Sequence, residues 1–126
     1  VAHDVRLFLQ TLFRPKYHNP AHMDEAIDEY VKAYSKPGAL RGGFAYYKAL
    51  FEENPAIDAE NPKEKITDKI RLIWGNNGGM GVFDVMKMWQ ACAPHATGRG
   101  LDECGHYVHE EQPEILSEEI LAFAEK

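Results

Sequence analysis

Apolar residues between positions 4 and 52 recur at the three- and four-residue spacing that places them on one face of an α-helix. The pattern predicts three helices, over residues 4–12, 20–34 and 39–52. Pro15 and the Pro37-Gly38 pair interrupt it where helices should end, because proline disfavours helical backbone in the residue before it. Asn19 followed by Pro20 is typical of a helix start. This part of the chain is therefore predicted to be all-helical.

The pattern changes in the second half, where an apolar run typical of a strand precedes renewed helical spacing. The predicted elements are a strand, a glycine-rich loop, a helix, a weaker strand and a terminal helix, over residues 69–74, 75–81, 82–89, 96–103 and 113–126. A strand-helix-strand-helix order predicts parallel strands joined by a right-handed crossover. The predicted fold class is therefore α/β, with a helical segment preceding a β-α-β-α unit.

Several apolar side chains and both cysteines are expected inside the molecule. In the second half of the chain, the apolar residues assigned to inward faces or to the core are Val82, Val85, Met86, Trp89, Leu116, Ile120, Phe123 and Trp74. Cys92 and Cys104 match no zinc or redox spacing, and we interpret them as buried free thiols.

Composition divides the chain into three parts. Residues 53–66 are polar and contain two Asn-Pro steps, so we place a linker at residues 58–68, between a helical segment (1–57) and an α/β unit (69–126). Two parallel strands leave two open edges, and parallel sheets occur almost only within larger covered sheets. We therefore expect the N-terminal half of the same protein, or a second chain, to complete the sheet.

Charge and composition narrow the function classes. The formal charge is −6, with 44% hydrophobic and 27% charged residues, which gives no basic footprint for nucleic acid or a membrane surface. No apolar run is long enough to span a membrane, and the first residues lack the pattern of a signal peptide. We expect a cytoplasmic protein whose partners include a small-molecule substrate.

A turn after the second predicted strand carries the most suggestive chemistry. It consists of Cys104-Gly105-His106, and open α/β sheets place functional side chains in loops at the carboxyl ends of strands. An imidazole titrates near neutral pH and suits base chemistry. On spacing alone, a structural or solvated histidine is an equally good interpretation of His106.

Other candidate sites are weaker. His18 and His22 lie on either side of a proline and do not share a helical face, which argues against a metal pair. Residues 75–81 lack the spacing of a dinucleotide or phosphate loop. We interpret the acidic run over residues 110–119 as a solvated helix start, and Asp84 as a helix-start residue. Neither a metal nor a cofactor is expected.

Three segments resemble an α/β-hydrolase of the epoxide hydrolase and haloacetate dehalogenase group, and the resemblance runs over nearly the whole chain. Residues 30–49 are similar to the cap segment of that group, Leu72-Ile73-Trp74-Gly75 to its next-to-last strand, and residues 104–114 to the segment after its last strand. The resemblance implies that this chain is the C-terminal portion of such a hydrolase.

The resemblance also implies a mechanism. In this group an aspartate forms an alkyl-enzyme ester, and a histidine then activates the water that hydrolyses the ester. His106 matches that histidine. Tyr47 matches a cap tyrosine that hydrogen-bonds the substrate oxygen or the departing halide, and Tyr46 is a weaker candidate beside it. Tyr47 also lies on the apolar face of its helix, so a core role is the alternative.

Two features of the group are missing from the sequence. Residues 75–81 hold no carboxylate where epoxide hydrolases commonly carry the acid that orients the histidine, so the acid follows an earlier strand or the triad is defective. No nucleophile-elbow pattern occurs. We therefore predict cleavage of a carbon–halogen or epoxide bond only by a complete enzyme. The alternatives are a serine-type α/β-hydrolase acting on an ester or carbon–carbon bond, and a non-catalytic fragment.

Overall fold

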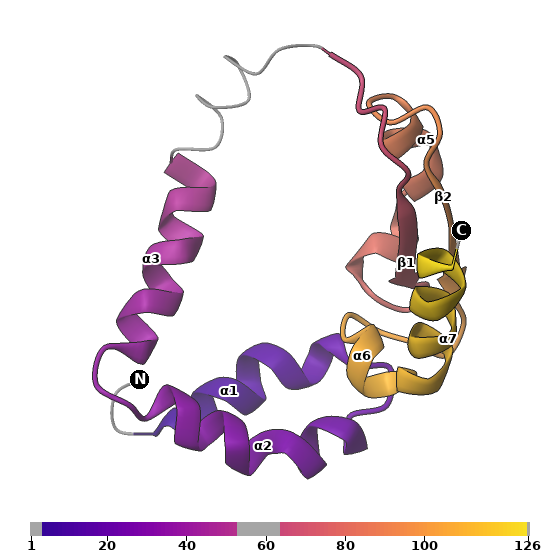
Figure 1. Cartoon of the computed structure of the whole chain (residues 1–126). Helices are drawn as coiled ribbons and strands as arrows, with labels where there is room; N and C mark the ends of the chain where they lie inside the picture. The colour runs from indigo at the N-terminus through magenta and orange to yellow at the C-terminus, as the bar shows by residue number, and fades with distance from the viewer. Residues whose placement is uncertain (1–3, 53–63, 126) are drawn as a thin grey trace.

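The computed structural model describes residues 4–52 and 64–125, which form helices and a two-stranded parallel sheet (Figure 1). In chain order the elements are α1 (Val5–Phe13), η1 (Arg14–Lys16), α2 (Ala21–Tyr34), α3 (Ala39–Glu52), β1 (Arg71–Gly75), η2 (Gly79–Val82), α5 (Val85–Gln90), β2 (Thr97–Leu101), α6 (Val108–Glu111) and α7 (Pro113–Ala124). The predicted α/β class and parallel pairing are confirmed. Most of the predicted linker, residues 58–68, lies outside the described residues. No helix of the described ranges is long and apolar enough to cross a membrane.

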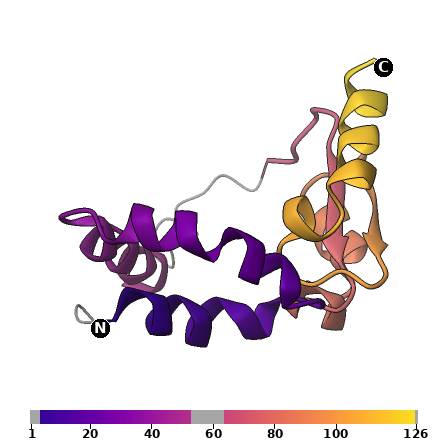
Figure 2. The same cartoon turned by 90° about the horizontal axis from the view of Figure 1, so that it is seen from below.

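Helices α1 and α2 lie side by side and enclose an apolar cluster (Figure 2). The buried residues of this cluster are Leu9, Tyr17, Met23 and Ile27. At the start of α2, the Asn19 side-chain oxygen accepts a hydrogen bond from the Ala21 N–H at 3.1 Å. Asn19 therefore helps to begin the helix, as its position before a proline predicts.

Helix α3 extends away from this pair as an arm (Figure 1). Gly38 turns the chain into α3 with a φ of 84°, a backbone conformation that favours glycine. Phe44 of α3 packs edge-on against Phe8, with ring centroids 5.6 Å apart. Beyond that contact α3 exposes large apolar side chains, including Phe51, which is 75% exposed. The apolar face predicted for α3 is largely uncovered in the described structure.

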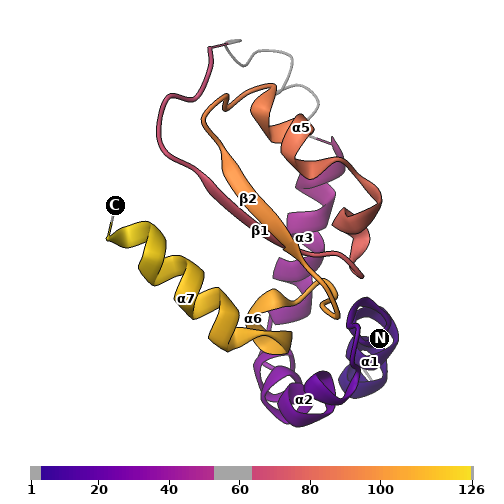
Figure 3. The ribbon, with the colours of Figure 1, turned by 90° about the vertical axis from the view of Figure 1, so that its right-hand side faces the viewer.

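Strands β1 and β2 pair in register from Arg71 opposite Thr97 to Gly75 opposite Leu101. Helices α5 and α7 lie on opposite sides of the two strands (Figure 3). Neither strand has a second neighbour among the described residues, so each has one open edge. A Cβ atom on Gly75 would lie 1.9 Å from the Gly105 carbonyl oxygen, so only glycine lets the end of β1 pass the loop after β2.

Several side chains predicted to lie in the core are exposed. Ile120 and Phe123 of α7 are 58% and 40% exposed, and Trp89 of α5 is 37% exposed. Leu116 and Trp74 are half-buried. The prediction was wrong for Ile120, Phe123 and Trp89 because a two-stranded sheet is too narrow to cover the apolar faces of both flanking helices. It was also wrong for Val82, which is 82% exposed because it ends η2 and lies outside α5, whereas Val85 of α5 is buried as predicted.

The two cysteines differ in environment. Both are free thiols, as predicted, and Cys104 is buried, but Cys92 is exposed. Cys92 follows α5, and its thiol donates to the Trp89 carbonyl at 3.2 Å. The prediction of burial was therefore wrong for Cys92, because Ala91 and Cys92, the two residues directly after this short helix, lie at the surface. Burial raises the pKa of the Cys104 thiol, and the nearby Glu111 carboxylate adds to the effect.

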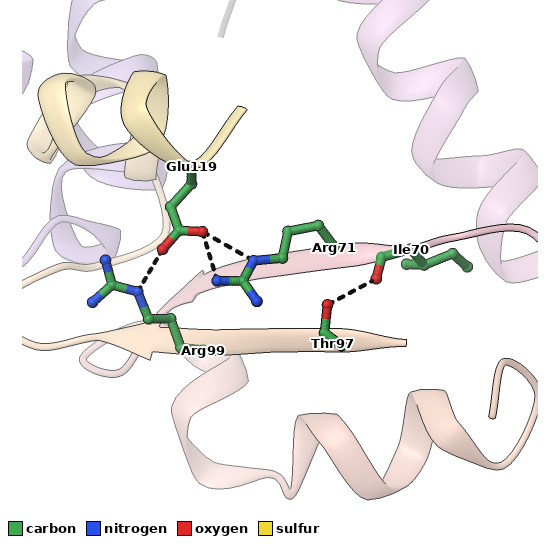
Figure 4. Close-up of polar contacts among 5 residues, drawn as sticks. All are labelled: Ile70, Arg71, Thr97, Arg99 and Glu119. Carbon is green, nitrogen blue, oxygen red and sulfur yellow. Dashed lines mark hydrogen bonds and ion pairs between the residues drawn. The ribbon is translucent and has the colours of Figure 1, made fainter. Parts of the chain in front are cut away.

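A charge cluster joins α7 to the sheet (Figure 4). One Glu119 carboxylate oxygen accepts hydrogen bonds from Arg71 Nε at 2.9 Å and Nη2 at 2.6 Å, and the other accepts from Arg99 Nε at 2.7 Å. Arg71 and Arg99 come from adjacent strands, so a single carboxylate bridges both strands and the helix. Hydrogen bonds from the two guanidinium groups hold the pKa of Glu119 below its ordinary value.

We expect Leu9→Ala to destabilise the protein by about 2–5 kcal/mol, because it leaves a cavity in a fully buried position. Leu7 lies on the same helix and is 60% exposed, so Leu7→Ala is the matched control. Denaturant unfolding followed by circular dichroism measures both free energies of unfolding. An equal decrease in the free energy of unfolding for the two variants would contradict the assignment of Leu9 to the core.

Glu119→Gln is expected to lower the Tm at neutral pH, whereas Glu118→Gln, on the exposed side of α7, should leave it unchanged. The Glu119 pKa is lower in the folded state, so its stabilisation is present above the ordinary value of 4.5 and is lost as the pH falls through the lowered value. The Tm difference between wild type and Glu119→Gln should therefore shrink on acidification. A difference independent of pH would show that the cluster does not act through the Glu119 charge.

Candidate active site

A pocket of about 400 Å³ lies between the helical segment and the turn that precedes α6. It brings together all three candidate residues from the sequence, His106, Tyr47 and Tyr46. The other residues that line it are Phe13, Lys16, Tyr17, Tyr30, Tyr34, Gly43, Tyr107, His109 and Glu110. All six tyrosines of the chain contribute, so the walls are aromatic and carry phenol groups.

His106 lies in the loop between β2 and α6, at the carboxyl end of the sheet. Its backbone N–H donates to the Lys16 carbonyl at 2.8 Å, and its ring meets the Tyr107 ring edge-on at 5.0 Å. The imidazole is exposed and, within residues 4–52 and 64–125, hydrogen-bonds no carboxylate. The backbone and one ring contact thus fix the position of His106, while its ring nitrogens stay available to the pocket.

Tyr47 and Tyr46 reach the pocket from α3. Tyr47 is 44% exposed and Tyr46 is 69% exposed, and their rings contact each other edge-on at 5.8 Å. Neither phenol is enclosed in a packed core within the described residues. The role of each tyrosine as a donor to substrate stays a prediction.

Glu110 lines the pocket as an acceptor held by two phenols. The Tyr17 hydroxyl donates to one carboxylate oxygen at 2.6 Å, and the Tyr30 hydroxyl donates to the other. Burial, and then the adjacent carboxylate, raise the pKa of Tyr30 to about 12 and that of Tyr17 further. Both phenols therefore stay protonated at neutral pH and act as donors.

Glu111 is buried and lies outside the lining of this pocket. Its Oε1 accepts a hydrogen bond from the Gly105 N–H at 2.8 Å, and its Oε2 accepts from the N–H groups of His18 and Asn19 at 2.8 and 3.0 Å. The prediction that the acidic run is a solvated helix start was wrong for Glu119, which Arg71 and Arg99 bind, and also for Glu110 and Glu111. The donors to Glu110 and Glu111 lie 80 or more positions away on the N-terminal side, except for Gly105, so no local pattern could reveal them.

The remaining sequence candidates lie outside this pocket. Asp84 caps α5 by accepting a hydrogen bond from the Lys87 N–H at 3.1 Å, which confirms its predicted position at a helix start. Asn76, in the glycine-rich loop, donates to the Asp102 carboxylate at 2.8 Å. In the ranges that the structure covers, no three residues among His, Cys, Asp and Glu are grouped to hold a metal ion, and this applies to His18 and His22.

No family model matches the sequence. The chain is 33% identical over 129 aligned residues to a soluble epoxide hydrolase of Corynebacterium, an alignment that covers 98% of this chain and 43% of that enzyme. It is 26% identical to human epoxide hydrolase 4, over 79% of this chain and 26% of the human protein. The chain thus spans less than half the length of the curated relatives it matches.

Solved structures that resemble this chain include an epoxide hydrolase as well. The ligand-free epoxide hydrolase CorEH matches with a TM-score of 0.82 and 28% identity, over 97% of this chain and 43% of that enzyme. Cfl2 of Burkholderia cenocepacia matches with a TM-score of 0.84 and 27% identity, over 97% of this chain and 41% of Cfl2. Together, these similarities show that the chain belongs to the α/β-hydrolases, in the group that includes the epoxide hydrolases, and corresponds to the C-terminal part of their fold.

Proposed function

We propose that this chain is the cap segment and C-terminal core of a cofactor-free hydrolase that opens an epoxide or a carbon–halogen bond through an aspartyl ester, with His106 as the water-activating base. The observation that carries the proposal is the pocket itself. His106 and Tyr47 are 59 positions apart in sequence, yet both line one cavity whose walls are otherwise mostly aromatic. The relatives named as epoxide hydrolases favour the epoxide over the halide.

The proposed reaction has two steps. An aspartate carboxylate from the rest of the enzyme attacks the substrate carbon, forming an ester bond and breaking the carbon–oxygen bond of the epoxide or the carbon–halogen bond. The phenol of Tyr47 donates to the departing oxygen or halide, where negative charge develops. His106 then takes a proton from a water whose oxygen attacks the ester carbonyl, which releases the alcohol and restores the aspartate.

The nucleophile and the acid partner are proposed to come from the N-terminal half of the same hydrolase or from a second chain. Two features of the described structure support further strands beside β1. β1 has no neighbour on one side in the described structure, and the flanking helices expose Ile120, Phe123 and Trp89. Further strands beside β1 would cover both the open edge and these side chains. Without them, the chain by itself is expected to be inactive.

In the complete hydrolase, His106→Ala should slow turnover by about 10²–10⁴-fold, because a general base is lost. The covalent ester should accumulate and add the substrate's mass to the enzyme in intact-protein mass spectrometry. His95→Ala, an exposed histidine outside the pocket, is the control and should turn over normally. Normal turnover by His106→Ala would remove His106 from the mechanism, and an adduct mapped to a serine would favour the serine-type alternative.

Tyr47→Phe should lower the rate of ester formation by about 10²-fold, since it removes one hydrogen-bond donor from the developing charge. Stopped-flow measurement of the first step, with the Tm recorded alongside, separates this effect from unfolding. Tyr46→Phe serves as the comparison, because Tyr46 is the weaker candidate. Its loss should slow ester formation less than the loss of the Tyr47 hydroxyl. An unchanged rate for Tyr47→Phe would rule out its role as a donor.

A further inference from the structure

We propose that Glu111 is a positioning residue for His106, and that it acts by clamping the His106 loop to the chain segment that leads into the cap helix α2. The inference rests on the proposed role of His106 as a base and adds a residue to that mechanism. Glu111 does not line the His106 pocket. It acts through Gly105, the residue directly before His106.

The clamp consists of one carboxylate and two chain segments. Oε1 accepts from the Gly105 N–H at 2.8 Å, on the loop after β2. Oε2 accepts from the N–H groups of His18 and Asn19 at 2.8 and 3.0 Å, on the segment between η1 and α2. A carboxylate that is only 9% exposed would be costly without such donors, and three backbone N–H groups satisfy it.

The two segments are also held by their backbones. The His106 N–H donates to the Lys16 carbonyl at 2.8 Å. A Cβ atom on Gly105 would lie 2.4 Å from that carbonyl oxygen, 2.5 Å from the His18 nitrogen and 2.7 Å from Glu111 Oε1. The loop that carries His106 therefore touches the cap-side segment so closely that a small displacement of either would move the imidazole.

The neighbouring carboxylate, that of Glu110, also binds the helical segment, on the side that faces the pocket. Glu110 accepts hydrogen bonds from the hydroxyls of Tyr17 and Tyr30, which form the cap-side wall of the pocket. Consecutive residues of α6 thus bind the cap segment in two ways, through phenols on the pocket side and through backbone N–H groups on the buried side. Of the two, Glu111 alone also holds the loop that bears His106.

Glutamine is the discriminating substitution. It keeps the size of the side chain but offers one oxygen, and its NH₂ group would face an N–H donor. The amide side chain could therefore satisfy either the Gly105 N–H or the pair from His18 and Asn19, but not both. Glu111→Gln should uncouple the two segments while filling the same volume, so lost packing does not enter the comparison.

The test compares the two chemical steps in the complete hydrolase. A misplaced base slows only hydrolysis of the ester, whereas general damage to the pocket slows ester formation as well. In single-turnover measurements with an epoxide, Glu111→Gln should slow ester hydrolysis by about 10-fold or more, with ester formation changed less than about 2-fold. Glu114→Gln, an exposed glutamate at the start of α7, is the matched control and should match wild type. Equal slowing of both steps, or of neither, would overturn the proposal.

A second measurement does not depend on the proposed reaction. In NMR spectra of the wild-type chain and of Glu111→Gln, the amide signals of Gly105, His18 and Asn19 should shift, and the His106 imidazole signals should broaden. Unchanged His106 signals would overturn the positioning role even if the wild-type enzyme proved inactive on epoxides and haloacetates, an outcome that would refute only the proposed function. If Glu111→Gln does not fold, Glu111→Asp replaces it in both measurements. The shorter aspartate side chain keeps the charge but cannot reach both segments. The same rate and NMR results as for Glu111→Gln then support or overturn the proposal.

Discussion

The constraint on which the rest of this structure depends is the incompleteness of its parallel sheet. Strands β1 and β2 each pair along one side only, and α5 and α7 lie on opposite sides of them (Figure 3). Two strands are too narrow to cover the apolar faces of both helices. Parallel sheets occur almost only where both faces are covered. Apolar residues of α3, α5 and α7 lie exposed on faces that no other part of the described structure covers.

The helical segment is joined to the α/β unit by a set of hydrogen bonds centred on α6. Two consecutive carboxylates of α6 accept hydrogen bonds from Tyr17, Tyr30, His18 and Asn19 across the junction, and the Lys16 carbonyl accepts one from the His106 N–H. Buried charged acceptors with full sets of donors hold loops in one arrangement. The pocket that contains His106 and Tyr47 lies at this junction, which explains how residues from both parts share one cavity.

Sequence periodicity predicted the order of the elements because apolar spacing depends on local geometry. It could not say what each apolar face would meet, and so Ile120, Phe123 and Trp89 were wrongly assigned to a core that the described residues do not supply. Residue type and family resemblance selected His106 and Tyr47, and the pocket contains both. The contacts of Glu110 and Glu111 were missed because the helix-dipole argument considers only the start of their own helix. Most of their hydrogen-bond donors belong to residues 17–30, which are distant in sequence.

Amide hydrogen exchange along β1 tests the central claim, that this chain is completed by further strands, most directly. The amides of Arg71–Gly75 that point away from β2 should exchange rapidly in the monomeric chain, because no described strand pairs with that edge. In the complete hydrolase the same amides should be strongly protected by a neighbouring strand. Equal protection of this edge in the monomeric chain and in the longer enzyme would show that the sheet needs no partner, and would contradict the claim.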